Sequence, residues 1–203
     1  QVGCNNAREL LSLASLKVIP SVGIDQSGAF LEQGRVLAKA AGLEPRLIEA
    51  DIYDLPDDVG TFDLVLVTIG VLNWMPDLGG FFRVIAGLLG PGGHLLVYET
   101  HPVMEMFDPE SDTPHEPAIS YFRTDPLKEE GLISYDGGDH GSGGKGYCFS
   151  HTLRKIVTSC ATAGMTITSL KEFGYSIREP EYDVYEGREA QIPMSYLLHA
   201  RKM

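Results

Sequence analysis

Residues that mark several protein classes are scarce in this sequence. Cysteine occurs only three times in 203 residues, as Cys4, Cys148 and Cys160, and no two form a C-x-x-C pair. An odd number of widely spaced cysteines argues against both a disulfide scaffold and a zinc knuckle. We therefore expect reduced thiols and a cytoplasmic protein.

Basic residues are also few, and long apolar runs are missing. Lysine and arginine number 16 against 28 acidic residues, which gives a formal net charge of −12. Phosphate backbones need positive charge, so nucleic acid is not an expected partner. No run approaches the roughly 20 apolar residues that span a bilayer, and no secretory leader is visible, so no membrane partner is expected.

The first hundred residues alternate strand and helix signals. Buried-strand patterns are followed by amphipathic stretches, with Ser27 as a helix N-cap and Gly42 as a C-cap. Such alternation predicts an α/β, Rossmann-like fold with helices on both faces of a mostly parallel sheet. The expected strands cover 21–25, 62–70 and 94–102, and residues 46–56 are expected to form a strand that runs into a loop. The expected helices cover 7–16, 26–42 and 76–93, the last ending in a Gly-Pro-Gly-Gly stop.

The pattern changes after His101. Residues 102–150 are rich in proline, acid and, over 135–146, glycine, which predicts an insertion with a mobile loop or hairpin turn. Long loops in compact domains are usually functional, so we expect a substrate cap. A helix over 149–164 and strands over 167–177 and 192–203 follow, the last strand antiparallel. The whole chain, 1–203, is expected to form a single domain.

Small and acidic residues mark the ends of successive strands. Gly3 lies in a turn before a helix, where backbone N–H groups can approach a ligand. Asp25 ends the second strand, where a carboxylate can accept hydrogen bonds from a ribose diol. Asp51 follows the third strand, where it can accept from the adenine amine while Ile52 packs on the ring. In parallel sheets ligands bind beyond these strand ends.

The stretches QVGCNNARE, VGID, EADIYDLP, FDLVLVTIGVLNWMPD and LLGPGGHLLVYE carry a family resemblance. They resemble the successive motifs of class I S-adenosylmethionine-dependent methyltransferases, in the small-molecule, ubiquinone/menaquinone-type branch. The resemblance implies S-adenosylmethionine as co-substrate, a small-molecule acceptor and S-adenosylhomocysteine as product. The implied cofactor-binding residues are Gly3, Asn5, Asp25, Gln26, Asp51, Ile52, Thr68, Ile69, Gly70, Leu72, Asn73 and Trp74.

Two features depart from the family pattern. The family motif is G-x-G-x-G, whereas this turn keeps Gly3 and then has Asn5 and Ala7. Asparagine tolerates positive φ, so Asn5 can keep the turn. Only Gln1 and Val2 are available for the central first strand, so we expect residues upstream of Gln1 to supply it. An intact mass equal to the 22.2 kDa of these residues would contradict that expectation.

Three residues are candidates for chemistry. His101 follows the fifth strand and is the main candidate base, because histidine exchanges protons near neutral pH. Glu105 and His151 are further candidates at the mouth of the site and on its lid side. Each also has a structural alternative, and Glu99 is expected to be a buried, paired carboxylate.

The insertion supplies the expected substrate contacts. Tyr121 and Tyr147, with Phe122 and Phe149, can form an aromatic wall for a flat substrate or simply the core of the insertion. No metal site is expected, because His115, Asp139 and His140 match no standard ligand spacing.

Two other functions remain open at this point. A NAD-dependent oxidoreductase would also use Asp25, although it normally needs the second glycine that this turn lacks. A non-catalytic module could keep the adenosine pocket alone. The acceptor atom and the choice between monomer and homodimer are not determined by the sequence.

Overall fold

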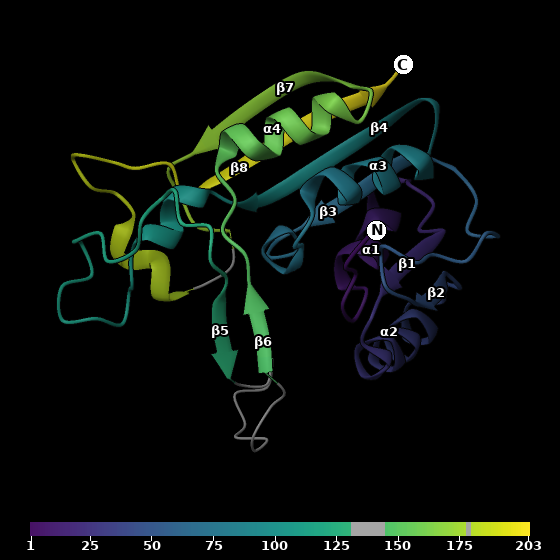
Figure 1. Cartoon of the computed structure of the whole chain (residues 1–203). Helices are drawn as coiled ribbons and strands as arrows, with labels where there is room; N and C mark the ends of the chain where they lie inside the picture. Colours follow the sequence, from purple (N-terminus) through teal and green to yellow (C-terminus); the bar gives the residue numbers. More distant parts are fainter. Residues whose placement is uncertain (131–144, 178–179) are drawn as a thin grey trace.

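Strands and helices alternate through the first half of the chain, as the pattern predicts (Figure 1). The computed structural model describes residues 1–130, 145–177 and 180–203. Its first elements are α1 (Arg8–Ser12), the 3-10 helix η1 (Leu13–Leu16), β1 (Val22–Asp25), α2 (Gly28–Ala41), β2 (Arg46–Glu49), β3 (Phe62–Thr68), η2 (Leu72–Trp74), α3 (Leu78–Leu88) and β4 (Leu89–Thr100).

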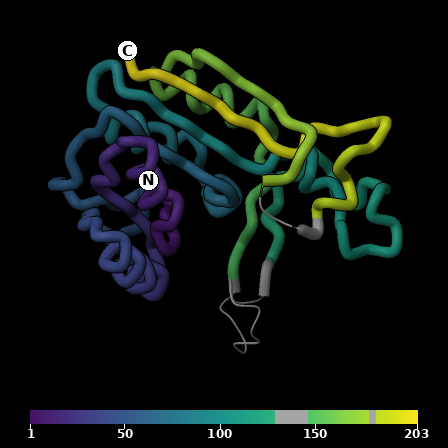
Figure 2. Tube along the Cα trace, turned by 180° about the vertical axis from the view of Figure 1, so that it is seen from behind, coloured from purple at the N-terminus to yellow at the C-terminus, as the bar shows by residue number. Residues whose placement is uncertain are grey.

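The second half adds the predicted insertion and then a helix and two strands. Its elements are η3 (Pro102–Met106), β5 (Leu127–Glu130), β6 (Lys145–Cys148), α4 (Leu153–Thr162), β7 (Met165–Phe173), η4 (Pro180–Tyr185) and β8 (Ser195–Lys202). In both views β5 and β6 project away from the main sheet (Figures 1 and 2). Most of the predicted glycine-rich turn, including Asp139 and His140, lies outside the described residues.

The sheet has the expected strand directions. β1 pairs in parallel with β2, and β3 pairs in parallel with β4. β8 runs antiparallel to both of its neighbours, β4 and β7, which confirms the antiparallel last strand. Val2 forms parallel bridges with Ile24 and Val67 and so joins the β1–β2 pair to the four-stranded sheet β3-β4-β8-β7.

Local sequence signals place the helix ends. The side chain of Ser27 accepts a hydrogen bond from the backbone N–H of Phe30 at 3.4 Å, and Gly42 ends α2 with φ of 67°. The predicted stop of α3 is corrected: the helix ends at Leu88, and the Gly-Pro-Gly-Gly stretch belongs to the start of β4. Leu89 pairs with Phe62, and the register shifts before the regular ladder resumes at Leu64.

The helices pack on the sheet, and their buried apolar residues form two separate cores. α3 and α4 contact each other and pack on the larger core, whose fully buried members include Phe81, Phe82 and Ile85. α1 and α2 enclose a smaller core around Leu10 and Leu31. Burial of these apolar faces, at about 25 cal/mol per Å², holds the helices in place.

The turn before α1 needs an unusual backbone. Gly3, Asn5 and Ala7 all have positive φ, at 61°, 50° and 61°. Asn5 therefore keeps the turn as predicted, and Ala7 adopts a conformation that costs about 1–2 kcal/mol in an L-residue. A Cβ on Gly3 would lie 2.5 Å from Cγ2 of Val71, so the turn packs directly on the segment after β3.

Replacing Gly3 tests this contact. Gly42 is a matched control, since its φ of 67° is similar but a Cβ there would meet nothing within 4 Å. We expect Gly42→Ala to cost about 1 kcal/mol from backbone strain alone, and Gly3→Ala to cost about 1–3 kcal/mol more from the clash with Val71. Urea unfolding measures both, and equal losses would contradict the packing argument.

Candidate functional site

Asp25 ties the glycine turn to the end of β1. One carboxylate oxygen accepts a hydrogen bond from the backbone N–H of Asn5 at 2.7 Å, and the other accepts from Ser27 at 2.9 Å. The backbone N–H of Cys4 also donates to the carbonyl of Ile24 at 3.0 Å. The turn, the strand end and the start of α2 are thus held as one unit around a partly exposed carboxylate.

Asp51 lies at the neighbouring strand end. Asp25 pairs with Glu49 in the parallel register, and its carbonyl accepts from the backbone N–H of Ala50 at 3.0 Å, so β2 ends beside β1 and Asp51 follows two residues after the strand. Oδ1 of Asp51 accepts from the backbone N–H of Tyr53 at 2.9 Å. This turn fixes an exposed carboxylate next to buried Ile52.

Residues 68–75, which start at the end of β3, lie at the same edge of the sheet as Asp25 and Asp51. Gly70 has φ of 87°, and its backbone N–H donates to Glu99 Oε2 at 2.5 Å. Leu72 donates to Oε1 of the same carboxyl at 3.1 Å, so Glu99 is buried and paired as predicted. Burial raises the pKa of Glu99 to about 7, against the opposing effect of hydrogen bonds from the backbone amides of Gly70, Leu72 and Val71.

Other predicted residues occupy the same edge. The hydroxyl of Thr68 accepts from the Gln1 side chain at 2.7 Å, and the carbonyl of Asn73 accepts from the backbone N–H of Phe149 at 2.7 Å. Ile69 and Trp74 are partly buried, whereas Gln26 is exposed. The structure thus brings the glycine turn, both aspartates and the segment after β3 to the carboxyl ends of neighbouring parallel strands.

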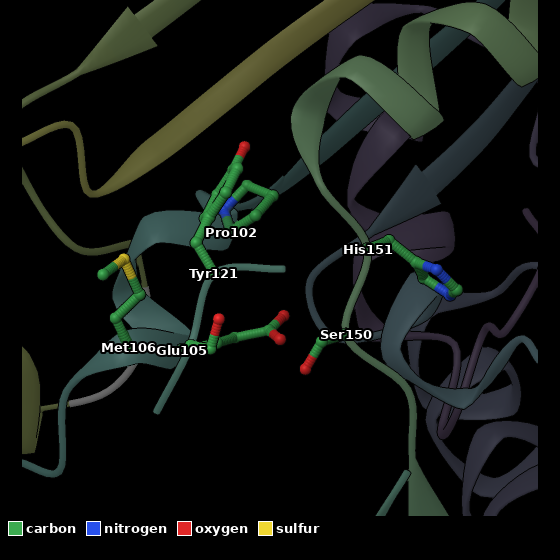
Figure 3. Close-up of a pocket in the computed structure, with 7 residues that line it drawn as sticks. Pro102, Glu105, Met106, Tyr121, Ser150 and His151 are labelled. Atoms are coloured by element: carbon green, nitrogen blue, oxygen red, sulfur yellow. The ribbon is translucent and has the colours of Figure 1, made fainter. Parts of the chain in front are cut away.

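A small recess adjoins this edge. It is lined by the side chains of Pro102, Glu105, Met106, Ser120, Tyr121, Ser150 and His151. Glu105 and Ser150 point toward one another across it (Figure 3), and Glu105 is hydrogen-bonded to the side chains of Ser150 and Asn73. Burial raises the pKa of Glu105, an effect that those hydrogen bonds partly offset.

His151 is held by the backbone. Its ring turns away from Glu105 in Figure 3, and Nε2 lies 2.8 Å from the carbonyl of Met75. Nδ1 lies 3.4 Å from Nζ of Lys155. Burial lowers the pKa of His151 to about 4, so the ring is neutral at pH 7 and Nε2 donates to the carbonyl. Its role as a base stays a prediction, with both nitrogens engaged by the protein.

His101 is similarly engaged. It is buried and precedes η3, where Nδ1 accepts from the backbone N–H of Val103 at 3.1 Å. Nε2 lies 3.0 Å from Oε1 of Glu172 on β7. Burial lowers the pKa of His101, and the Glu172 carboxylate acts in the opposite direction. The ring therefore contacts an amide N–H and a carboxylate of the protein, and the catalytic role of His101 stays a prediction.

The aromatic residues of the insertion divide into two groups. The hydroxyl of Tyr121 accepts from the backbone N–H of Leu153, at 2.9 Å, and so caps α4 beside the recess. Tyr147 and Phe122 are 48% and 78% exposed, so they do not form the core of the insertion.

Sequence reasoning missed two partners. Ser150 faces Glu105, and its position directly before His151 at the start of a helix was the available signal. Glu172 gave no signal, because strand pairing brings it to His101 from a distant part of the sequence.

Two features are absent from the described residues. Within 1–130, 145–177 and 180–203 no helix is long and apolar enough to cross a membrane. The same residues contain no group of three or more histidine, cysteine or acidic side chains arranged to hold a metal ion.

Comparison with known proteins supports the reading of this edge. Residues 1–97 match the family model described as "Methyltransferase domain". The demethylmenaquinone methyltransferase of Thermus thermophilus is 40% identical over 84 residues, which is 40% of this chain and 36% of that protein. The chain therefore matches about a third of the length of this curated relative.

Solved structures match the chain over its whole length. A protein from Listeria monocytogenes assigned to the S-adenosylmethionine-dependent methyltransferases has a TM-score of 0.70 at 18% identity, covering 100% of this chain and 89% of that one. An S-adenosylmethionine-dependent methyltransferase from Mesorhizobium loti has a TM-score of 0.65 at 18% identity, covering 99% and 88%.

The match of residues 1–97 and the shared architecture agree with the motifs at the strand ends. Residues 1–97 thus resemble the methyltransferase-domain family, and the chain as a whole shares its fold with solved S-adenosylmethionine-dependent methyltransferases.

Proposed function

We propose that the protein transfers a methyl group from S-adenosylmethionine to a small-molecule acceptor. One observation carries this proposal: Asp25, Asp51 and the segment 68–75 meet at the carboxyl edge of neighbouring parallel strands. Ligands of open α/β sheets bind at that edge. The resemblance to methyltransferases indicates S-adenosylmethionine as the ligand, and the residues at this edge fit it.

Each part of the co-substrate has a matching group. The Asp25 carboxylate accepts hydrogen bonds from the ribose hydroxyls, while Asp51 accepts from the adenine amine. The turn at Gly3 and the backbone of residues 68–70 hold the methionine end, where Gly3 packs against Val71. Charge-assisted hydrogen bonds of this kind contribute about 1.5–3 kcal/mol each.

The chemistry is an in-line displacement. A lone pair of the acceptor forms the bond to the methyl carbon, the carbon–sulfur bond breaks, and its electron pair neutralises the sulfonium to give S-adenosylhomocysteine. The protein must hold the acceptor about 3–3.5 Å from the methyl carbon in the correct line. A hydroxyl or amine acceptor also releases a proton, and a positioned base accelerates that step.

Glu105 is the group best suited to receive that proton. It lines the recess beside the cofactor edge, it contacts Asn73 of the segment after β3, and burial raises its pKa. His101 and His151 already have both ring nitrogens near protein groups. The Glu105 carboxyl is hydrogen-bonded too, but it lines the recess, whereas His101 does not line it and the ring of His151 turns away from Glu105 (Figure 3). We assign Glu105 as the base on this position.

The insertion, residues 102–150, acts in this proposal as the substrate cap of a single domain. Its exposed Phe122 and Tyr147 favour a flat, largely apolar acceptor. Demethylmenaquinone, the substrate in the name of the Thermus relative, belongs to that chemical class. The protein would act in the cytoplasm, as a monomer or homodimer, without nucleic acid, in keeping with three cysteines that form no disulfide and a net charge of −12.

Calorimetric titration separates this proposal from the nicotinamide alternative. We expect S-adenosylhomocysteine to bind and NAD to show no heat of binding, because the turn lacks the second glycine that pyrophosphate needs. Binding of NAD without S-adenosylhomocysteine would contradict the proposal. Binding of S-adenosylhomocysteine without turnover on any acceptor would leave a non-catalytic module.

Replacing Asp51 tests the adenine contact. We expect Asp51→Ala to weaken S-adenosylhomocysteine binding about tenfold, since one hydrogen bond to a carboxylate is lost. Asp57→Ala, which removes an exposed carboxylate further along the same loop, is the control. Equal affinities of the two variants would show that Asp51 does not touch the nucleoside.

Replacing Glu105 and His101 separately tests the base. With a panel of naphthols, naphthoquinols and arylamines, we expect Glu105→Gln to lower kcat about 10²-fold or more, with little change in KM for S-adenosylmethionine. His101→Gln is expected to change kcat only a few-fold. The reverse pattern would assign the base to His101.

A further inference from the structure

The segment from Thr68 to Met75 connects the cofactor edge to the insertion and is attached on two sides. On the insertion side, the carbonyl of Asn73 accepts a hydrogen bond from the backbone N–H of Phe149. The carbonyl of Met75 accepts one from the ring of His151. On the sheet side its amides donate to Glu99. Val71, between those two amides, is the residue that packs on Gly3.

Glu99 is an unusual partner for these amides. It is 3% exposed, and its two oxygens are each used by a different backbone N–H, from Gly70 and from Leu72. A carboxylate can accept at both oxygens, whereas a protonated carboxyl presents one O–H donor. The ionised form therefore fits both amides, and the protonated form fits one.

We propose that Glu99 is a positioning residue whose ionised carboxylate holds Gly70–Leu72 in the conformation that receives the methionine end of S-adenosylmethionine. This inference rests on the proposed function. It acts through backbone: Glu99 fixes the two amides, the amides fix Val71, and Val71 supports the glycine turn at Gly3.

Groups around Glu99 favour its protonated form. Glu105 from η3 is a second carboxylate nearby, and it raises the pKa of Glu99 in addition to burial. Tyr196 on β8 is the register partner of Glu99 and is fully buried, and Cys160 of α4 lies near Tyr196. Since the pKa of Glu99 is raised to about 7, both protonation states are populated at neutral pH.

The sign of the pH effect follows from these contacts. Glu99 contributes folding stability that is full below about pH 4.5 and is lost as pH rises through about 7, because the buried charge then has to be carried. Cofactor affinity changes in the opposite direction, because the ionised carboxylate orders the amides. Ionisation of Glu99 thus lowers the folding stability and orders the amides of Gly70 and Leu72.

The first test measures binding against pH. We expect the Kd of wild-type protein for S-adenosylhomocysteine to fall about three- to tenfold between pH 6 and pH 8, within the range expected for a charged hydrogen bond. Glu99→Gln can accept only one amide, so we expect binding at pH 8 about tenfold weaker than wild type and no step near pH 7. Asp58→Asn, at an exposed ion pair near the start of β2, should keep the wild-type profile.

The second test does not need a folded variant. Amide hydrogen exchange of wild-type residues 69–73, corrected for intrinsic rates, should slow as pH rises through 7, even without ligand. Constant protection across that range, or a Glu99→Gln variant with wild-type affinity and pH profile, would overturn the role of Glu99. Absence of any S-adenosylhomocysteine binding by wild-type protein would instead overturn the proposed function, while the exchange data would still test the loop.

Discussion

The cofactor edge depends on the carboxylate of Asp25, which accepts one backbone N–H from the glycine turn and one from the start of α2. These two hydrogen bonds fix a turn in which Gly3, Asn5 and Ala7 have positive φ, a conformation that two of the three adopt at a cost. They also direct the carboxylate to the end of β1, beside β2 and Asp51. Strand pairing places Asp25 beside the end of β2, and the hydrogen bonds of Asp25 fix the conformation of the glycine turn.

Local signals allowed much of the fold to be predicted. Ser27 and Gly42 delimit α2 because capping is decided by nearby atoms. Asp25 and Asp51 could be placed at one edge because parallel strands end together. The boundary between α3 and β4 was not predictable, because Leu89 joins the sheet through pairing with Phe62, a contact from another strand.

Contacts between distant segments limited the prediction of the site. His101 follows a strand at the expected place, yet Glu172 reaches its ring only because β8 pairs with β4 and β7 pairs with β8 in the same sheet. Met104, Tyr185 and Met194 likewise form a small core between η3 and the segment before β8. Neither arrangement has a periodic pattern in the sequence. These neighbours are the reason why we propose Glu105 as the base in place of His101.

The proposed function requires Asp25 and Asp51 to bind the same nucleoside. The most direct measurement is a crystal structure of the protein with S-adenosylhomocysteine. The account predicts ribose hydroxyls within about 3 Å of the Asp25 carboxylate, the adenine amine beside Asp51, and the homocysteine end against Gly3 and Gly70. A nucleoside bound elsewhere, with these two aspartates facing only solvent, would contradict it.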